Sequence, residues 1–212
     1  MSIVGRNHDG RDVRSRLVRR VALDTVGPQR VDGTTILLRR ARISDGPAWR
    51  AARLRDADRL RPAFGDDVTL TAWVEHVLED REATGQGMLE PLLAVDDEGH
   101  VLGECTFSLD RRSGLAECSM WTVSATTPGQ TTWIIVSAAL WLLERRPTIP
   151  WIVAPVAVSN PGPARMLTAS GFEQAAMARQ LRLYDGVPTD HDIWRLENTP
   201  AVRERLRVLA AG

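Results

Sequence analysis

Lysine is absent from this 212-residue chain, because each of its 27 basic side chains is an arginine. Chemistry that needs a lysine amine, such as Schiff-base formation or phosphate binding by a P-loop lysine, is therefore excluded. The arginines are balanced by 27 acidic side chains, so the formal net charge is zero. Without an excess of positive charge the chain lacks the general attraction to phosphates that nucleic-acid binding depends on, and we expect no nucleic-acid partner.

Cysteine and histidine are scarce. Two cysteines, Cys105 and Cys118, cannot form a disulfide framework or a zinc site of their own, and we interpret them as buried thiols in a reducing compartment, the cytoplasm. The four histidines lie in separate contexts, and the common His-based metal and triad motifs are missing. We therefore expect no metal. His191 is the histidine of most interest, because Asp190 and Asp192 flank it.

Long apolar segments are also missing. The longest one, residues 133–143, is shorter than the ~18–20 residues that a membrane-spanning helix needs. The N-terminus has no apolar signal core. We expect no membrane partner. Residues 1–33 are polar and rich in arginine, and we interpret them as an extension that could strap onto a second copy of the chain in a homodimer.

Hydrophobic periodicity and turn residues predict the order of elements from residue 34 onward. Strands are expected at 34–40, 92–95, 101–109, 116–123, 151–158, 173–184 and 192–197, and helices at 44–60, 70–83, 131–144, 161–169 and 199–211. This order predicts one mixed α/β domain over residues 34–198, followed by a C-terminal helix in 199–212. Its sheet would be antiparallel in the N-terminal half and part of a βαβα unit in the C-terminal half, with helices on both faces.

The hairpin formed by 101–109 and 116–123 has a preferred register. Pairing Leu109 with Ala116 places apolar residues opposite one another on one face and polar residues on the other, whereas a one-residue slip would mix the faces. The two cysteines then belong to the core face. Glu104 and Glu117 share the polar face, which is either a solvated edge or the floor of a cleft.

The segment 116–144 reads as a strand, a loop over 124–130 and a deeply buried helix. A loop that leads into the N-terminus of a helix presents free backbone N–H groups and the positive end of the helix dipole. Such a place is a natural site for an anion.

The run from residue 35 to 196 resembles the GNAT-fold N-acetyltransferases, and most of all the ribosomal-protein-alanine acetyltransferases of the RimJ/RimL type. The segments that carry the resemblance are ILLRRARISDGPAWRAARLRD, GQGMLEPLLAVDDEGHVLGECTFSL, SMWTVS, VSNPGPARMLTASGF and LRLYDGVPTDHDIW. The resemblance implies a GNAT-like sheet, acetyl-CoA as the cofactor and an amine as the acceptor, for which a protein N-terminus is one candidate.

Several site residues follow from this resemblance. The end of the fourth family strand would pair with the pantetheine arm of acetyl-CoA, and the next loop would grip its pyrophosphate. The corresponding residues are Trp121, Thr122, Val123, Gly129, Gln130, Thr131, Thr132 and Asn160. Glu117, and secondarily Glu104, would accept a proton from the amine. The alternatives stay open: the two carboxylates could form a satisfied structural pair, and Asn160 could be a helix cap.

The pyrophosphate loop departs from the family pattern. Where the family has two glycines spaced one apart, this chain has Pro128 and Gln130, with Gly129 between them. Proline has no N–H to donate, and a side chain at 130 crowds the closest backbone approach. Losing one or two charge-assisted hydrogen bonds would weaken binding roughly ten- to several-thousand-fold. Pro163 also stands where the family often has a serine near the cofactor thiol.

Two functional hypotheses therefore remain. An acetyl-CoA-dependent N-acetyltransferase requires an open V-shaped gap between 116–123 and 151–158. A catalytically inactive GNAT-fold protein that acts as a binding or regulatory partner would have that gap filled by a side chain such as Trp121 or Trp133, and an exposed apolar patch elsewhere.

Overall fold

The computed structural model describes residues 25–212, so most of the extension expected at 1–33 lies outside the described residues. The strands are β1 (Thr25–Val31), β2 (Thr34–Arg39), β3 (Leu89–Asp96), β4 (Val101–Leu109), β5 (Ala116–Thr122), β6 (Trp151–Ala157), β7 (Glu173–Tyr184) and β8 (Val187–Glu197). The helices are the 3-10 turn η1 (Ile43–Asp45), α2 (Gly46–Arg55), α3 (Ala57–Phe64), α4 (Leu70–Gly85), α5 (Pro128–Arg145), α6 (Gly162–Ala169) and α7 (Pro200–Ala211). Within this part of the chain no helix is long and apolar enough to span a membrane.

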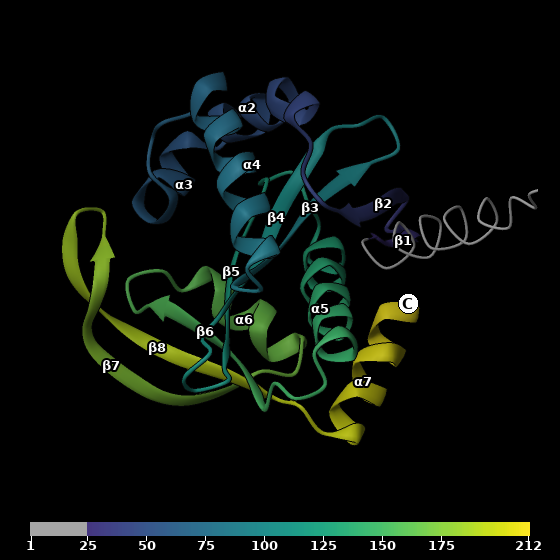
Figure 1. Ribbon diagram of the computed structural model, residues 1–212, viewed down its shortest axis with the longest axis vertical. Helices are drawn as coiled ribbons and strands as arrows, with labels where there is room; N and C mark the ends of the chain where they lie inside the picture. The colour runs from purple at the N-terminus through teal and green to yellow at the C-terminus, as the bar shows by residue number, and fades with distance from the viewer. Residues whose placement is uncertain (1–24) are drawn as a thin grey trace, which may run out of the picture.

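The strands form one eight-stranded sheet in the order β1-β2-β3-β4-β5-β6-β8-β7 (Figure 1). All neighbouring strands are antiparallel except β5 and β6, which the helix α5 connects in a parallel βαβ unit. The predicted fold class is therefore confirmed. The predicted register of β4 and β5 is confirmed as well, with Leu109 opposite Ala116 and Glu104 opposite Trp121.

The expectation that regular structure begins at Thr34 was wrong, because the preceding seven-residue segment forms the edge strand β1 against β2. The dipeptide Gly27-Pro28 in its middle hides the strand in the sequence, since these residues usually indicate a turn. In the structure the register shifts between Val26 and Gln29, and this irregularity accommodates the proline.

The helix expected over 44–60 is also divided, into η1, α2 and α3. The break between α2 and α3 falls at Asp56, whose backbone leaves helical geometry. The Asp56 carboxylate accepts a hydrogen bond from the Ser124 N–H at 2.7 Å, in the loop after β5. An Asp side chain that bonds backbone elsewhere competes with helix continuation, and this partner is distant in sequence.

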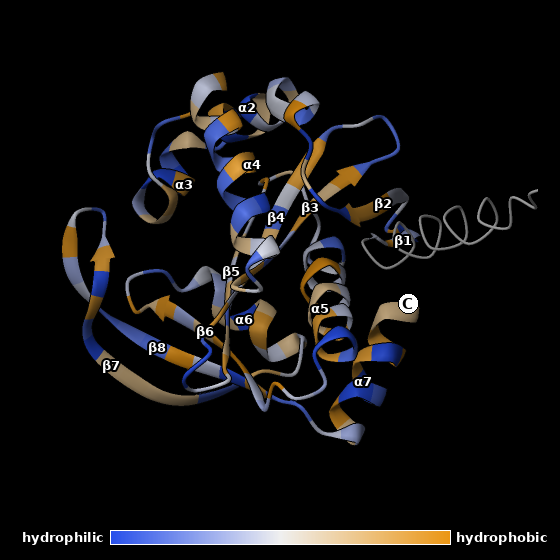
Figure 2. Ribbon diagram, viewed as in Figure 1, coloured by the Kyte–Doolittle hydropathy of each residue, from blue (hydrophilic) through white to orange (hydrophobic). Residues whose placement is uncertain are grey.

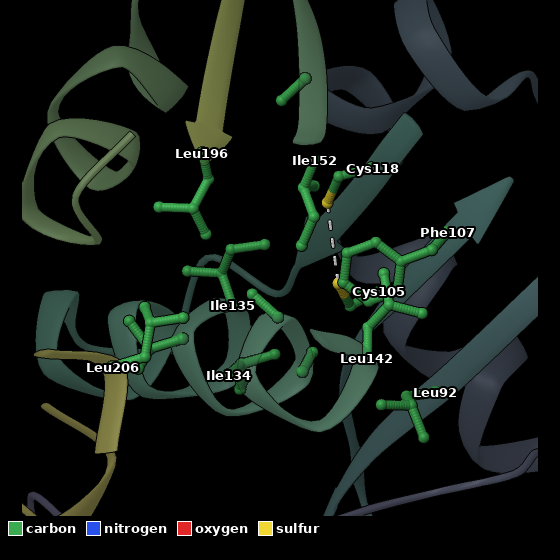
Figure 3. Close-up of a cluster of buried hydrophobic side chains, with 14 of the residues drawn as sticks. Leu92, Cys105, Phe107, Cys118, Ile134, Ile135, Leu142, Ile152, Leu196 and Leu206 are labelled. Atoms are coloured by element: carbon green, nitrogen blue, oxygen red, sulfur yellow. Dashed lines mark hydrogen bonds between the residues drawn. The ribbon is translucent and has the colours of Figure 1, made fainter. Parts of the chain in front are cut away.

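Two hydrophobic clusters cover the two faces of the sheet. On one face α5 packs against the apolar side of the sheet, where Cys105, Phe107 and Cys118 are buried, and α6 and α7 pack against α5 (Figure 3). The orange colour of α5 in Figure 2 reflects how apolar this central helix is. On the other face α2, α3 and α4 bury Trp49 and Trp73 against β3 and the end of β5. Both cysteines are free and buried, as expected, and their Sγ atoms lie 3.8 Å apart.

Glu90 on β3 is fully buried between the end of β2 and the end of α5. Its carboxylate is paired with the Arg40 guanidinium and accepts a hydrogen bond from Arg146 at 2.8 Å, just after α5. Burial alone would raise the pKa of Glu90, but the hydrogen bonds from Arg40 and Arg146 lower it below its usual value. This ion cluster ties the start of the sheet to the end of α5.

We predict that Glu90→Gln lowers the free energy of unfolding by about 1–3 kcal/mol, because it leaves three partly exposed guanidinium groups without the buried carboxylate that they share. Urea unfolding at pH 7 measures the loss. Since the pKa of Glu90 is lowered by folding, its stabilising effect is present above its usual value of 4.5 and is lost as the pH falls below it, so the difference should shrink in acid. Glu98→Gln, in an exposed turn, is the control and should stay within about 0.5 kcal/mol of the parent. Equal stabilities for parent and Glu90→Gln would contradict the prediction.

Candidate active site

The parallel strands β5 and β6 separate soon after they meet. In the part of the chain that the structure describes they pair only at Ala116 with Ile152 and at Glu117 with Val153. Beyond these pairs the β6-facing edge of β5 has no strand partner, and a cavity of about 190 Å³ opens between the strands. The V-shaped gap that the enzyme hypothesis requires is therefore present.

Side chains from both sides of the sheet line this gap cavity. They are Ala63, Phe64, Cys118, Ser119, Met120, Ile135, Ala154, Pro155, Val156, Ala157, Asn160, Pro163, Met166, Leu167, Arg182, Leu183, Tyr184 and His191. The tip of the β7–β8 hairpin bounds it, held against α3 by the hydrogen bond from the Asp185 N–H to the Pro62 carbonyl at 2.9 Å. Trp121 and Trp133 do not fill the gap, because each is buried in one of the two cores.

A second cavity of about 330 Å³ lies on the α2–α4 side of the sheet. Its lining consists of Trp49, Arg53, Phe64, Asp67, Ala72, His76, Glu104, Thr106, Ser119 and Trp121. Ser119 and Phe64 belong to both linings, so the two cavities meet at the middle of β5. The polar face of the β4–β5 hairpin is thus the floor of a cleft, which decides between the two interpretations that its pattern allowed.

Glu104 is the acidic group on this floor, and two residues of α4 surround it. The His76 Nε2 atom lies 2.9 Å from Glu104 Oε1 and 3.7 Å from Asp80 Oδ2. Trp121 Nε1 donates to Glu104 Oε2 at 3.3 Å. The sequence predicted Glu104 but missed His76 and Asp80. Their spacing of four residues on a helix was the available signal, but only the packing of α4 over β4 brings them to Glu104.

The charged side chains of this cluster shift one another's pKa values. The hydrogen bond with Glu104 raises the pKa of His76 to about 9, against the opposing effect of burial, and the charges of Asp80 and Glu79 add to the rise. Burial raises the pKa of Asp80 to about 6, with a further contribution from the Glu104 charge. At neutral pH His76 is therefore an imidazolium that donates to the Glu104 carboxylate. Asp80 Oδ2 is buried and has no hydrogen-bond partner among the described residues.

The same three side chains are the group within residues 25–212 that could hold a metal ion. Their ligand atoms lie within 4.8 Å of one another, and one histidine with two carboxylates suits a divalent cation. The imidazolium of His76 supplies positive charge at that place by itself. Our expectation that the chain uses no metal stays a prediction.

Glu117 lies away from this cluster. Its two carboxylate oxygens accept hydrogen bonds from Arg182 Nη1 and Nη2, both at 2.6 Å, and the pair bridges β5 and β7 where β5 and β6 are still paired. Glu104 lies opposite Trp121 in the β4–β5 hairpin. Glu117 is four residues before Trp121 on β5, a separation of roughly 13 Å along a strand. The structure therefore does not bring the two predicted carboxylates together, and Glu117 is a bridging residue of the narrow end of the gap.

The loop after β5 uses its backbone donors within the protein. The Val123 N–H donates to the Leu102 carbonyl at 2.8 Å, and the Ser124 N–H donates to Asp56. The Thr122 carbonyl accepts from the Arg59 guanidinium. Trp121 and Val123 are thus bonded to residues of β4 and Thr122 to Arg59 of α3, and their contact with a pantetheine arm stays a prediction.

The N-terminus of α5 is capped by its own residues. The helix begins at Pro128, three residues earlier than expected, because Thr127 is the N-cap and proline is well suited to the first turn. Thr127 Oγ1 accepts from the Gln130 N–H, and Gln130 Oε1 accepts from the Thr127 N–H, which completes a capping box. Gln130 Nε2 also donates to Thr34 Oγ1 at 3.0 Å in β2. Thr131 Oγ1 contacts Thr126 Oγ1 at 3.0 Å, and Thr132 is half-buried.

Asn160 lines the gap cavity beside His191, whose Nδ1 lies 2.8 Å from the Thr189 carbonyl oxygen. The alternative that Asn160 caps α6 was wrong. The N-cap of that helix is Pro161, which makes no side-chain cap hydrogen bond.

Solved structures of acetyltransferases of the RimJ/RimL type share this fold. RimJ of Mycobacterium smegmatis, solved with CoA-disulfide, matches with a TM-score of 0.76 and 24% identity over 87% of this chain and 94% of that chain. The ribosomal-protein-S5-alanine acetyltransferase of Vibrio fischeri matches with a TM-score of 0.69 and 18% identity over 78% and 94% of the two chains. An acetyltransferase of Salmonella typhimurium that modifies the N-terminal serine of ribosomal protein L7/L12 matches with a TM-score of 0.71 and 16% identity over 82% and 99%. At these identities the likeness establishes the fold. No protein-family model and no curated protein sequence matches the chain.

We predict that an NMR titration gives His76 a pKa of about 9, and that Glu104→Gln returns it toward its usual value of 6.5, because the variant removes the hydrogen bond and the negative charge that hold the proton. His76→Gln assigns the signal. Because folding raises this pKa, its stabilising effect is complete below pH 6.5 and is lost as the pH rises through 9. Glu117→Gln, at the other end of β5, should leave the pKa of His76 unchanged. An ordinary pKa for His76 in the parent protein would refute the imidazolium assignment.

Proposed function

We propose that this chain is an acetyl-CoA-dependent N-acetyltransferase that acts on an amine, with a protein N-terminus as the acceptor. The observation that carries the proposal is the meeting of two cavities at Ser119, one between the diverging strands and one lined by a carboxylate and an imidazolium. A group transfer requires the donor and acceptor to approach from two sides of one point, which this geometry supports. The acetyltransferase activity of the neighbouring structures supports the same reaction class.

The pantetheine arm of acetyl-CoA fits the residues that line the gap. The gap is lined mostly by apolar side chains, and the unpaired edge of β5 offers backbone N–H and C=O groups, which suits an extended arm that contains amides. The diphosphate fits poorly, because Pro128 has no N–H and the donors of Thr127 and Gln130 are used in the capping box. When bound, acetyl-CoA would supply an acetyl thioester, and the protein's own residues have to orient and deprotonate the acceptor.

Glu104 is the residue to which we assign the amine proton. Its Oε1 atom is fixed by His76, while Oε2 is held only by the longer 3.3 Å hydrogen bond from Trp121. Glu104 Oε2 would accept the proton, and His76 is a positioning residue that holds the carboxylate in place beside the cavity. Glu117, the first choice from the sequence, is engaged by Arg182 on both oxygens, and we assign it a structural role.

The lining of the second cavity supports the acceptor class in part. Asp67 and Glu104 offer carboxylates with which a protonated amine would pair, while the Arg53 guanidinium already lies over the rings of Trp49 and Phe64. A cavity of about 330 Å³ accommodates the first residues of a chain terminus rather than a folded surface. The named activities of the neighbouring acetyltransferases on ribosomal-protein N-termini point to the same class. We infer a cytoplasmic location, which the two free thiols support.

A catalytically inactive GNAT-fold partner protein is the second candidate. The closed N-terminus of α5 favours it, and so do the exposed apolar side chains Leu181, Leu183 and Val187 near the tip of the β7–β8 hairpin. The open gap favours the enzyme instead. A homodimer stays a prediction from the sequence.

We predict that millimolar acetyl-CoA supports acetylation of peptides with a free α-amine, detected as a gain of one acetyl group by mass spectrometry. Peptides with a blocked N-terminus should not react. Glu104→Gln should lower kcat by about 10²- to 10⁴-fold, because the proton acceptor is removed. The control Glu98→Gln, in the β3–β4 turn, should keep the parent rate.

Other results would change the assignment. A loss in Glu117→Gln as large as that in Glu104→Gln would move the catalytic role to Glu117. The complete absence of acetylation and of any thermal shift with acetyl-CoA would favour the inactive partner protein.

A further inference from the structure

A carboxylate of the protein itself stands at the N-terminus of α5. Asp32, in the turn between β1 and β2, accepts a hydrogen bond through Oδ2 from the Thr127 hydroxyl, the N-cap of the helix. The turn is anchored there by Gln130 Nε2, which donates to the Val31 carbonyl at 3.3 Å and to Thr34 Oγ1. The negative charge of Asp32 therefore meets the positive end of the helix dipole.

Gly129 permits this close approach. A Cβ atom built on Gly129 would lie 2.4 Å from Asp32 Oδ2 and 3.2 Å from its Cγ, so any other residue would push the carboxylate away. The Asp32 carboxylate thus lies against the first turn of α5, in the place where the dipole and the backbone donors would attract an external anion.

A second carboxylate occupies the other end of the same loop. Asp56 accepts the Ser124 N–H at 2.7 Å. Burial acts to raise its pKa, but the hydrogen bonds from Ser124 and the charge of Arg59 lower it, so Asp56 is ionised at neutral pH. A diphosphate lying along this loop would meet the Asp32 carboxylate at one end and the Asp56–Arg59 ion pair at the other, with few free donors between them.

The gap between β5 and β6 has a different character. Apolar side chains such as Met120, Ala154 and Leu167 dominate its lining, and no charge is required to bind an uncharged arm there. The two halves of a CoA-type donor therefore meet opposite conditions in this protein: the arm meets an open apolar gap, and the diphosphate meets negative charge.

We propose that the donor site recognises the acyl-pantetheine part of a thioester and discriminates against a diphosphate, with Asp32 as the specificity-determining residue. The inference rests on the proposed function, since it concerns the donor of that reaction. The donor class that fits the site is an acyl-pantetheine thioester whose affinity does not depend on a nucleotide diphosphate.

The test compares S-acetylpantetheine with acetyl-CoA by isothermal titration calorimetry on the full chain. In the parent protein S-acetylpantetheine should bind at least as tightly as acetyl-CoA, because the diphosphate meets the Asp32 charge. Asp32→Asn, which keeps an acceptor for Thr127 but removes the charge, should tighten acetyl-CoA binding about two- to fivefold, the size of effect that one exposed charge at a helix N-terminus produces. Binding of S-acetylpantetheine should not change.

Two further measurements make the result specific to charge. Raising the salt concentration should strengthen acetyl-CoA binding to the parent protein and have little effect on Asp32→Asn, because salt screens the repulsion. Asp97→Asn, in the exposed β3–β4 turn, is the matched control and should behave as the parent. Thermal melting checks that Asp32→Asn remains folded, and Asp32→Ser is the replacement if it does not.

The titration distinguishes failure of the selectivity proposal from failure of the proposed function. If acetyl-CoA binds the parent more tightly than S-acetylpantetheine, or if Asp32→Asn leaves the affinity for acetyl-CoA unchanged, the selectivity proposal is overturned while the proposed function survives. If neither thioester binds the parent or any variant, both are overturned.

Discussion

The early separation of β5 and β6 is the constraint on which the candidate site depends. The two parallel strands share two residue pairs and then diverge, while β6 stays paired with β8 along its whole length. Unpaired backbone groups are costly unless something satisfies them, so a strand edge inside a sheet that has no strand partner is a place built for a ligand or for water. The Glu117–Arg182 pair lies at the point of divergence and fixes where the gap begins.

Burial of the charged cluster around Glu104 is the second constraint. A carboxylate on the interior of a sheet is tolerated when a cation neutralises it, and His76 supplies that cation from α4. Asp80 is less well satisfied, since its buried Oδ2 has only the imidazolium nearby at 3.7 Å. Incompletely paired polar groups in a cleft are a common feature of functional sites, where the structure keeps a charge available for a substrate.

The sequence allowed the register of β4 and β5 to be predicted because their two faces differ in polarity, and any slip would bury charge. It also allowed Glu104 to be placed on a polar face. It could not show whether that face was covered, since this depends on how α4 packs over β4, and so His76 and Asp80 were missed. β1 was missed because Gly27-Pro28 resembles a turn, and the break at Asp56 was missed because its partner, Ser124, is distant in the chain.

The N-terminus of α5 shows how the same residues can favour folding over anion binding. Proline in the first turn, threonine at the N-cap and glutamine three residues later form one of the strongest local helix starts, and each uses or removes a donor that an anion would need. Asp32 then completes the cap from a different element. The positive charge and the backbone N–H groups at the start of α5 are thus largely satisfied within the fold. Under the proposed function, the binding energy for an acyl donor has to come from the gap between β5 and β6.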